Sequence, residues 1–146
     1  MYSSEIASIE AHSKVINGLI FYQNYLLSTG TDGFLKFMSV SDSEESYNLE
    51  KEIKLFDHAI TARCVFNDWL VAAGKEGGGE ENVCGLDNRI KTLKIGVNNN
   101  VQIIELGLPV VQVWSLVALE RFGKVIAVVR RRGIPMLEIW GGVPQS

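Results

Sequence analysis

Apolar residues along this chain gather in short blocks, each about as long as a single β-strand. Residues 15–22, 25–30 and 60–66 are rich in Val, Ile, Leu, Phe and Tyr, and clusters of Gly, Asn, Asp and Ser interrupt such blocks at short, regular intervals. Apolar residues at the three-to-four spacing of a helix are nearly absent. Short strands at regular spacing are typical of β-sandwiches, barrels and propellers. The pattern therefore predicts an all-β fold.

The blocks also repeat, which favours a propeller over a sandwich or barrel. After His12, an apolar block, the pair Gln23-Asn24 and a second block follow, and the same order follows His58 with Asn67-Asp68 as the turn. The two histidines lie 46 residues apart, close to the period of about 40–45 of a propeller blade. A third copy lacks the leading His and ends at Trp140. We expect one domain over residues 1–146 with blades at 11–56, 57–107 and 108–146.

The third strand of the second repeat has two candidate segments. Residues 75–81 form a polar, glycine-rich stretch that is typical of a loop. The candidates after it are residues 82–87 and residues 98–105, and the second begins with three asparagines that favour a tight turn. We favour 82–87 as the third strand, with 98–105 as an added strand or a connection between blades.

Three residues of the first repeat resemble the hydrogen-bond network of the WD40 propeller family. His12 precedes the first block, Ser28 lies in the second, and Asp32 lies in the turn that follows. In that family the His bridges the Ser and the Asp in a buried network, and His58 matches the same His in the second repeat. Met38 stands where the family has Trp, so the network ends early here.

The resemblance covers nearly the whole chain and implies about three four-stranded antiparallel sheets. It also implies a non-catalytic scaffold that binds a partner protein through loops at one rim. Three blades are too few to close a ring of the usual size, so we expect an incomplete ring unless another protein or a second copy completes it. The candidate rim residues are Ser13, Lys14, Lys75, Glu76, Arg130, Arg131 and Arg132.

Sequence motifs for catalysis or metal binding are missing. No Gly-x-Ser-x-Gly elbow is present, and the two histidines and two cysteines lack close ligand spacing. We therefore predict no enzyme, no metal and no cofactor. The competing interpretation is a small hydrolase that uses His12 or His58. The burial of these rings separates the two, since a catalytic His must reach a cleft.

The charges are unevenly distributed along the chain. Residues 1–58 hold nine acids and four lysines, residues 59–146 hold eight acids and ten bases, and the net charge is −3. This acidic balance is not the usual footprint of a nucleic-acid-binding protein. Arg131, Arg132 and Gly133 are similar to the Phe-Arg-Arg-Gly motif of phosphoinositide-binding propellers, although its Phe is missing. Binding of this lipid headgroup at a membrane surface is the alternative function.

Cysteine and tryptophan positions complete the expectations. Cys64 and Cys84 are expected to be reduced thiols in an intracellular protein, cytoplasmic or nuclear. No apolar run reaches the roughly 18 residues that a membrane helix needs, and the N-terminus does not resemble a signal peptide. Trp69, Trp114 and Trp140 lie in apolar contexts and are predicted to be core residues.

Overall fold

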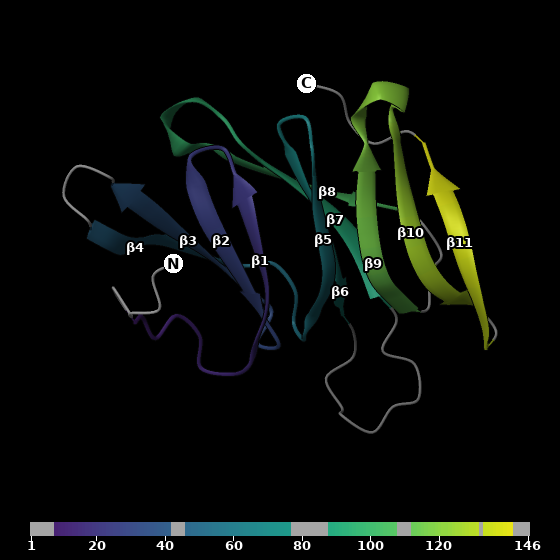
Figure 1. Cartoon of the computed structure of the whole chain (residues 1–146), viewed down its shortest axis with the longest axis horizontal. Helices are drawn as coiled ribbons and strands as arrows, with labels where there is room; N and C mark the ends of the chain where they lie inside the picture. Colours follow the sequence, from purple (N-terminus) through teal and green to yellow (C-terminus); the bar gives the residue numbers. More distant parts are fainter. Residues whose placement is uncertain (1–7, 42–45, 77–87, 108–111, 132, 142–146) are drawn as a thin grey trace, which may run out of the picture.

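The chain forms three antiparallel sheets that stand side by side as an open arc, as the computed structural model shows (Figure 1). It describes residues 8–41, 46–76, 88–107, 112–131 and 133–141. Within these residues the regular elements are strands and two short 3₁₀ turns, η1 (Val97–Asn99) and η2 (Glu120–Phe122). The all-β prediction is confirmed, and the sheets do not close into a ring.

Each sheet is a meander in which consecutive strands pair, and we call the three sheets the first, second and third blade. The first blade consists of β1 (Ile16–Tyr22), β2 (Tyr25–Gly30), β3 (Phe34–Ser41) and β4 (Ser46–Lys54). The second consists of β5 (Ile60–Phe66), β6 (Trp69–Lys75), β7 (Asn88–Ile95) and β8 (Val101–Leu106). The third consists of β9 (Gln112–Leu119), β10 (Lys124–Arg131) and β11 (Ile134–Trp140).

The sequence-based assignment of strands in the second and third blades needs two corrections. The favoured segment 82–87 lies outside the described residues, and the third strand of the second blade is β7, while β8 is the fourth. Arg89, Lys91 and Lys94 interrupt the apolar positions of β7, and such long side chains disguise a strand because their charged ends reach water. The third blade has three strands in the described part of the chain, where four were expected.

The second blade is buried on both faces, because a blade lies on each side of it. Cys64, Val71 and Ile90 share a buried cluster with Val113, Val125 and Val129 of the third blade. Ile60, Leu70 and Leu93 share another with Leu27, Leu35 and Phe37 of the first blade. Every residue of β6 from Trp69 to Gly74 is buried. The core therefore consists of two apolar layers, one between each pair of neighbouring blades.

Trp114 departs from the prediction that all three tryptophans lie in the core. Trp69 and Trp140 are buried, but Trp114 is 50% exposed. The β9–β10 ladder pairs Ser115 with Val128 and Val113 with Val129, so Trp114 lies in a bulge without a partner of its own. The guanidinium of Arg130 lies 5.2 Å from its ring centroid.

Neither described helix is long and apolar enough to span a membrane, since both are single 3₁₀ turns of three residues.

Because Cys64 is buried in the apolar layer between the second and third blades, we expect its thiol to react slowly with alkylating reagents. Burial, together with the charge of Glu120, raises the pKa of the Cys64 thiol to about 12. In a Cys84→Ser variant, where Cys64 is the single thiol, we expect a maleimide to react on the order of 1,000-fold more slowly than with a free cysteine at pH 8, because the thiolate is the reactive form. Mass spectrometry measures the labelling, and complete labelling in denaturant is the control. Rapid labelling of the native protein would contradict this packing.

Candidate interaction site

The candidate rim residues come from three separate loops that the fold brings to one edge of the arc. We call this edge, where β1, β5 and β9 begin, the lower rim; it lies at the bottom of Figure 1. Ser13 and Lys14 are exposed ahead of β1, and Lys75 ends β6 with Glu76 after it. The described residues at the end of β10 are Arg130 and Arg131, and Arg132 lies outside the described residues.

His12, Ser28 and Asp32 form a hydrogen-bonded group at the lower rim of the first blade. His12 Nδ1 lies 3.1 Å from both carboxylate oxygens of Asp32, and His12 Nε2 lies 2.7 Å from Ser28 Oγ. With Nδ1 protonated, the ring donates to Asp32 and accepts from the Ser28 hydroxyl. The side chain of His12 is 0% exposed and that of Asp32 is 6% exposed. The group therefore ties the segment ahead of β1 to β2 and to the β2–β3 turn.

The environment of Asp32 favours its charged form. Burial alone would raise the pKa of this carboxyl, but the amide of Phe34, which donates to Oδ1 over 3.1 Å, and the ring of His12 outweigh burial and lower it. A carboxyl whose folded-state pKa is depressed adds stability above its unfolded pKa, and this stability is lost as the pH falls through the folded-state value. At neutral pH the group therefore contributes fully.

The second blade does not repeat this group around His58. Tyr25 and Trp69 begin equivalent strands, and on this alignment Ala72 stands where the first blade has Ser28. Alanine has no hydroxyl, and the ring of His58 makes no hydrogen bond within the described part of the chain; its backbone N–H donates to the carbonyl of Lys75 over 3.0 Å. The structure thus differs from the expectation that His58 has the role of His12.

Glu76 takes the place of Asp32 in the second blade but has other partners. It pairs with the ammonium of Lys91, and it accepts a hydrogen bond from the backbone N–H of Asp57 over 3.2 Å. Burial alone would raise the pKa of Glu76, but these bonds, that of Lys91 first, lower it. Glu76 is therefore already held within the second blade.

Arg131 is engaged by an acid of the neighbouring strand. Its Nε and Nη2 bond both carboxylate oxygens of Glu138, the second over 2.8 Å, and Trp140 Nε1 donates to the same carboxylate over 3.0 Å. The hydrogen bond from Arg131 lowers the pKa of Glu138, and the same bond raises that of Arg131. A phosphate could form a bidentate contact with this guanidinium only by displacing Glu138. This weighs against the lipid-headgroup interpretation.

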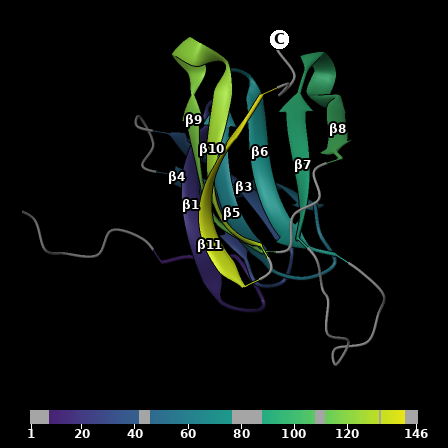
Figure 2. The same ribbon diagram turned by 90° about the vertical axis from the view of Figure 1, so that its right-hand side faces the viewer.

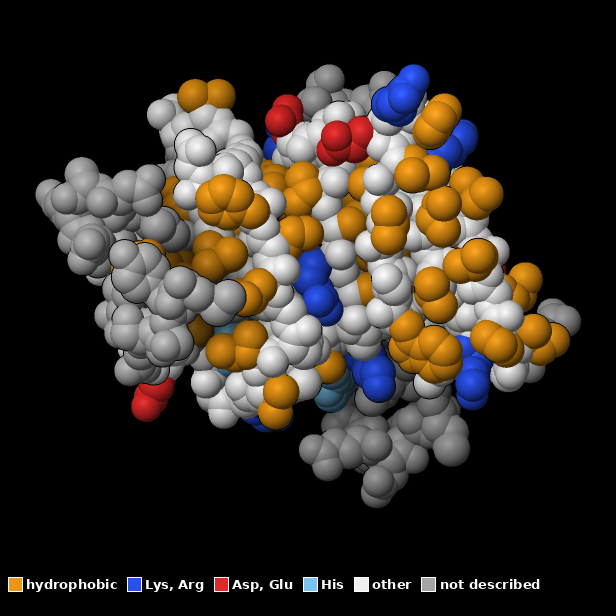
Figure 3. Space-filling view, in the orientation of Figure 1, with side chains coloured by type: hydrophobic (Ala, Val, Ile, Leu, Met, Phe, Trp, Pro, Cys, Tyr) orange, Lys and Arg blue, Asp and Glu red, His pale blue; other side chains and the backbone are white. Residues whose placement is uncertain are grey.

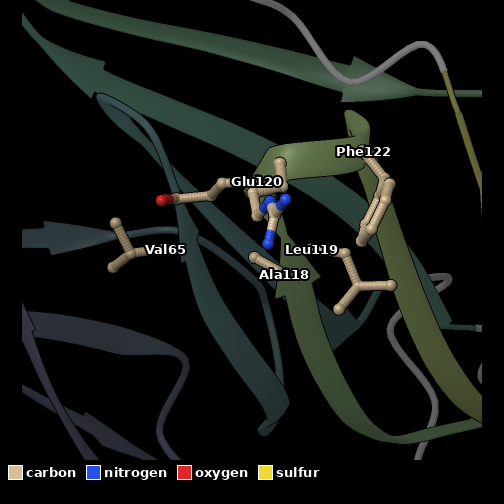
Figure 4. A pocket seen from close by; sticks show the side chains of 6 residues that line it. Val65, Ala118, Leu119, Glu120 and Phe122 are labelled. Carbon is tan, nitrogen blue, oxygen red and sulfur yellow. The ribbon is translucent and has the colours of Figure 1, made fainter.

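A shallow hollow lies at the opposite edge, the upper rim, between the second and third blades. Its volume is about 480 Å³, and Glu120 of its wall reaches across to the second blade, where its Oε1 accepts a hydrogen bond from Asn67 N over 2.7 Å. Figure 4 shows its lining, with Val65 on one side and Phe122 on the other. The residues that line it are Val65, Ala118, Leu119, Glu120, Arg121 and Phe122. This hollow has no signature in the sequence, because hairpins of two different repeats form it.

Comparisons with known proteins give weak structural likenesses. No protein-family model matches the chain, and no curated protein matches its sequence. The crystal structure of the computationally designed Ika4 protein superposes with a TM-score of 0.46 at 15% identity, covering 96% of this chain and 99% of that chain. The WD40 domain of Neurospora crassa Pan2 superposes with a TM-score of 0.43 at 9% identity, covering 79% of this chain and 47% of that chain.

Replacing Ser28 by Ala tests whether the His12 group stabilises the fold. The change leaves Nε2 of the buried His12 ring without its partner, so we expect the free energy of unfolding to fall by about 1–3 kcal/mol. Denaturant titration measures it. The matched control is Ser13→Ala at the exposed neighbouring position, which should stay within about 0.5 kcal/mol of the wild type. Equal stability of both variants would contradict a structural role for the group.

Proposed function

We propose that the chain is a non-catalytic interaction scaffold of the WD40-like propeller type, which binds an acidic surface of a partner protein through its lower rim. One observation carries the proposal. Lys14, Lys75 and Arg130, one from each blade, lie on the same rim, and none of them is in an ion pair within the described residues. Exposed cations that are not engaged in ion pairs can attract an acidic partner surface.

The buried His12 group supports the non-catalytic part of the proposal. Its histidine has both nitrogens engaged and no exposed side-chain surface, whereas a general base must reach the proton that it abstracts. Ser28 is also buried, at 8% exposure, so its hydroxyl is poorly placed to attack a substrate. In this proposal His12, Ser28 and Asp32 have a structural role alone: they stabilise the first blade.

The free thiol supports an intracellular site of action. Cys64 is a buried free cysteine between two blades, and thiols stay reduced in the cytoplasm and nucleus. The proposed scaffold therefore acts in the cytoplasm or nucleus.

The phosphoinositide alternative has less support than a protein partner. It needs the guanidinium of Arg131, which Glu138 already holds with two hydrogen bonds. Its test is sedimentation with vesicles that contain a phosphoinositide. Binding that is lost on Arg131→Ala would favour the lipid over the protein partner.

Charge reversal of the rim tests the proposed function. A fluorescent Glu-rich peptide should bind the wild type in low salt and bind more weakly as salt rises. In a variant with Lys14→Glu, Lys75→Glu and Arg130→Glu we expect the affinity to fall at least about tenfold, because the rim then repels the peptide. Fluorescence anisotropy measures the binding.

The matched control reverses three cations away from the lower rim, with Lys51→Glu, Lys94→Glu and Lys124→Glu. The control has the same net charge as the rim variant, so it separates the position of the charges from their number. If both variants lose affinity equally, or if the wild type does not bind the peptide, the proposed rim site is wrong.

A further inference from the structure

The two terminal blades each expose an apolar face at the ends of the arc. In the first blade, Leu27 and Phe37 face the second blade. Successive residues of a strand point to opposite faces of the sheet, so the neighbours of Leu27 and Phe37 along their strands face outward. The outward residues include Leu19 and Phe21 of β1, which are 64% and 66% exposed. The apolar residues of this outer face are Leu19, Phe21, Leu26, Met38 and Leu49, and the ladders place Ser28, Lys36 and Glu52 on the same side.

The third blade has a corresponding outer face at the other end. Val125, Ala127 and Val129 face the second blade, and the alternate residues of β10 face away with their ladder partners. Leu137 and Ile139 of β11 are 73% and 68% exposed. The apolar residues of this outer face include Val117, Ile126, Val128, Leu137 and Ile139, and Ser115 and Arg130 lie on the same side. Figure 3 shows hydrophobic side chains over β9, β10 and β11, and Figure 2 views the arc from this end.

The outer face of the first blade matches the surface by which the second blade packs on the first. The hairpin pairs Tyr22–Tyr25 and Phe66–Trp69 align the two blades. On this alignment, Leu26 corresponds to Leu70, and Met38 corresponds to Leu93. Leu70 and Leu93 are fully buried against the first blade. The outer face of the first blade therefore resembles the face of the second blade that packs on the first, and it could pack on another blade in the same way.

The outer face of the third blade matches the surface by which the second blade packs on the third. Aligned from their hairpins, Ile126 corresponds to Val71 and Leu137 to Ile90. Val71 and Ile90 are fully buried in the cluster shared with the third blade. The two outer faces thus correspond, position by position, to the two surfaces that meet where neighbouring blades pack within the arc.

We propose that the third blade's outer face packs on the first blade's outer face of a second copy of this chain, and that the reciprocal contact closes a ring of six blades. A head-to-tail contact closes when the rotation permits it. Propellers typically have four to eight blades, and with three blades per chain two copies are the number that falls in this range. The proposal does not depend on binding at the lower rim, which stays open in such a ring.

Paired face variants test the proposal by sedimentation velocity. The first-face variant carries Leu19→Asp and Phe21→Asp, and the third-face variant carries Leu137→Asp and Ile139→Asp. All four positions are exposed in the arc, so the fold of each blade should survive, and circular dichroism checks this. We expect a wild-type dimer, and at least about 100-fold weaker self-association of each variant, because the substitution buries an unpaired charge.

Mixing the two variants gives the decisive result. Each retains the face that the other has lost, so an equimolar mixture should again form a two-chain species through one intact contact. The matched control, Val97→Asp with Phe122→Asp, changes two exposed apolar residues of the upper rim and should remain a dimer. A monomeric wild type, assemblies larger than two chains, or a dimer formed by either face variant alone would overturn the proposal.

Discussion

The burial of the second blade on both of its faces is the constraint on which the rest of the structure depends. Its strands β5, β6 and β7 supply residues to both apolar clusters, and no described residue of β6 before Lys75 is exposed. A sheet that is apolar on both faces needs a neighbour on each side. The first and third blades have the same two-faced composition but one neighbour each, so the exposed apolar residues gather at the two ends of the arc.

Polar contacts at the upper rim fix how neighbouring blades sit against each other. The hydroxyl of Tyr22 in the first blade donates to the carbonyl of Asp68 over 2.6 Å and accepts from the amide of Ile95 over 3.2 Å. Glu120 makes the equivalent link between the third and second blades through the amide of Asn67. Apolar faces associate without directional preference, so these few directed bonds, together with side-chain fit, set the register between the blades.

Features contained within one repeat could be predicted from the sequence. The hairpins of the first two blades follow from apolar blocks around a two-residue turn, and His12, Ser28 and Asp32 lie together because all three belong to one blade. The strand β7 could not be predicted in this way, because its arginine and lysines conceal the apolar positions that face the two neighbouring blades. The exposure of Trp114 depends on a bulge in the β9–β10 ladder, which apolar composition does not encode.

Hydroxyl-radical footprinting of the purified chain tests most directly whether the ends of the arc are covered. Phe21 on the first blade's outer face and Phe122 on the upper rim are 66% and 67% exposed in the arc, so they form a pair matched in chemistry and exposure. If the terminal faces are covered in solution, as two-faced blades require, Phe21 should oxidise several-fold more slowly than Phe122. Equal oxidation rates would mean that the end faces stay in water, and they would contradict the account.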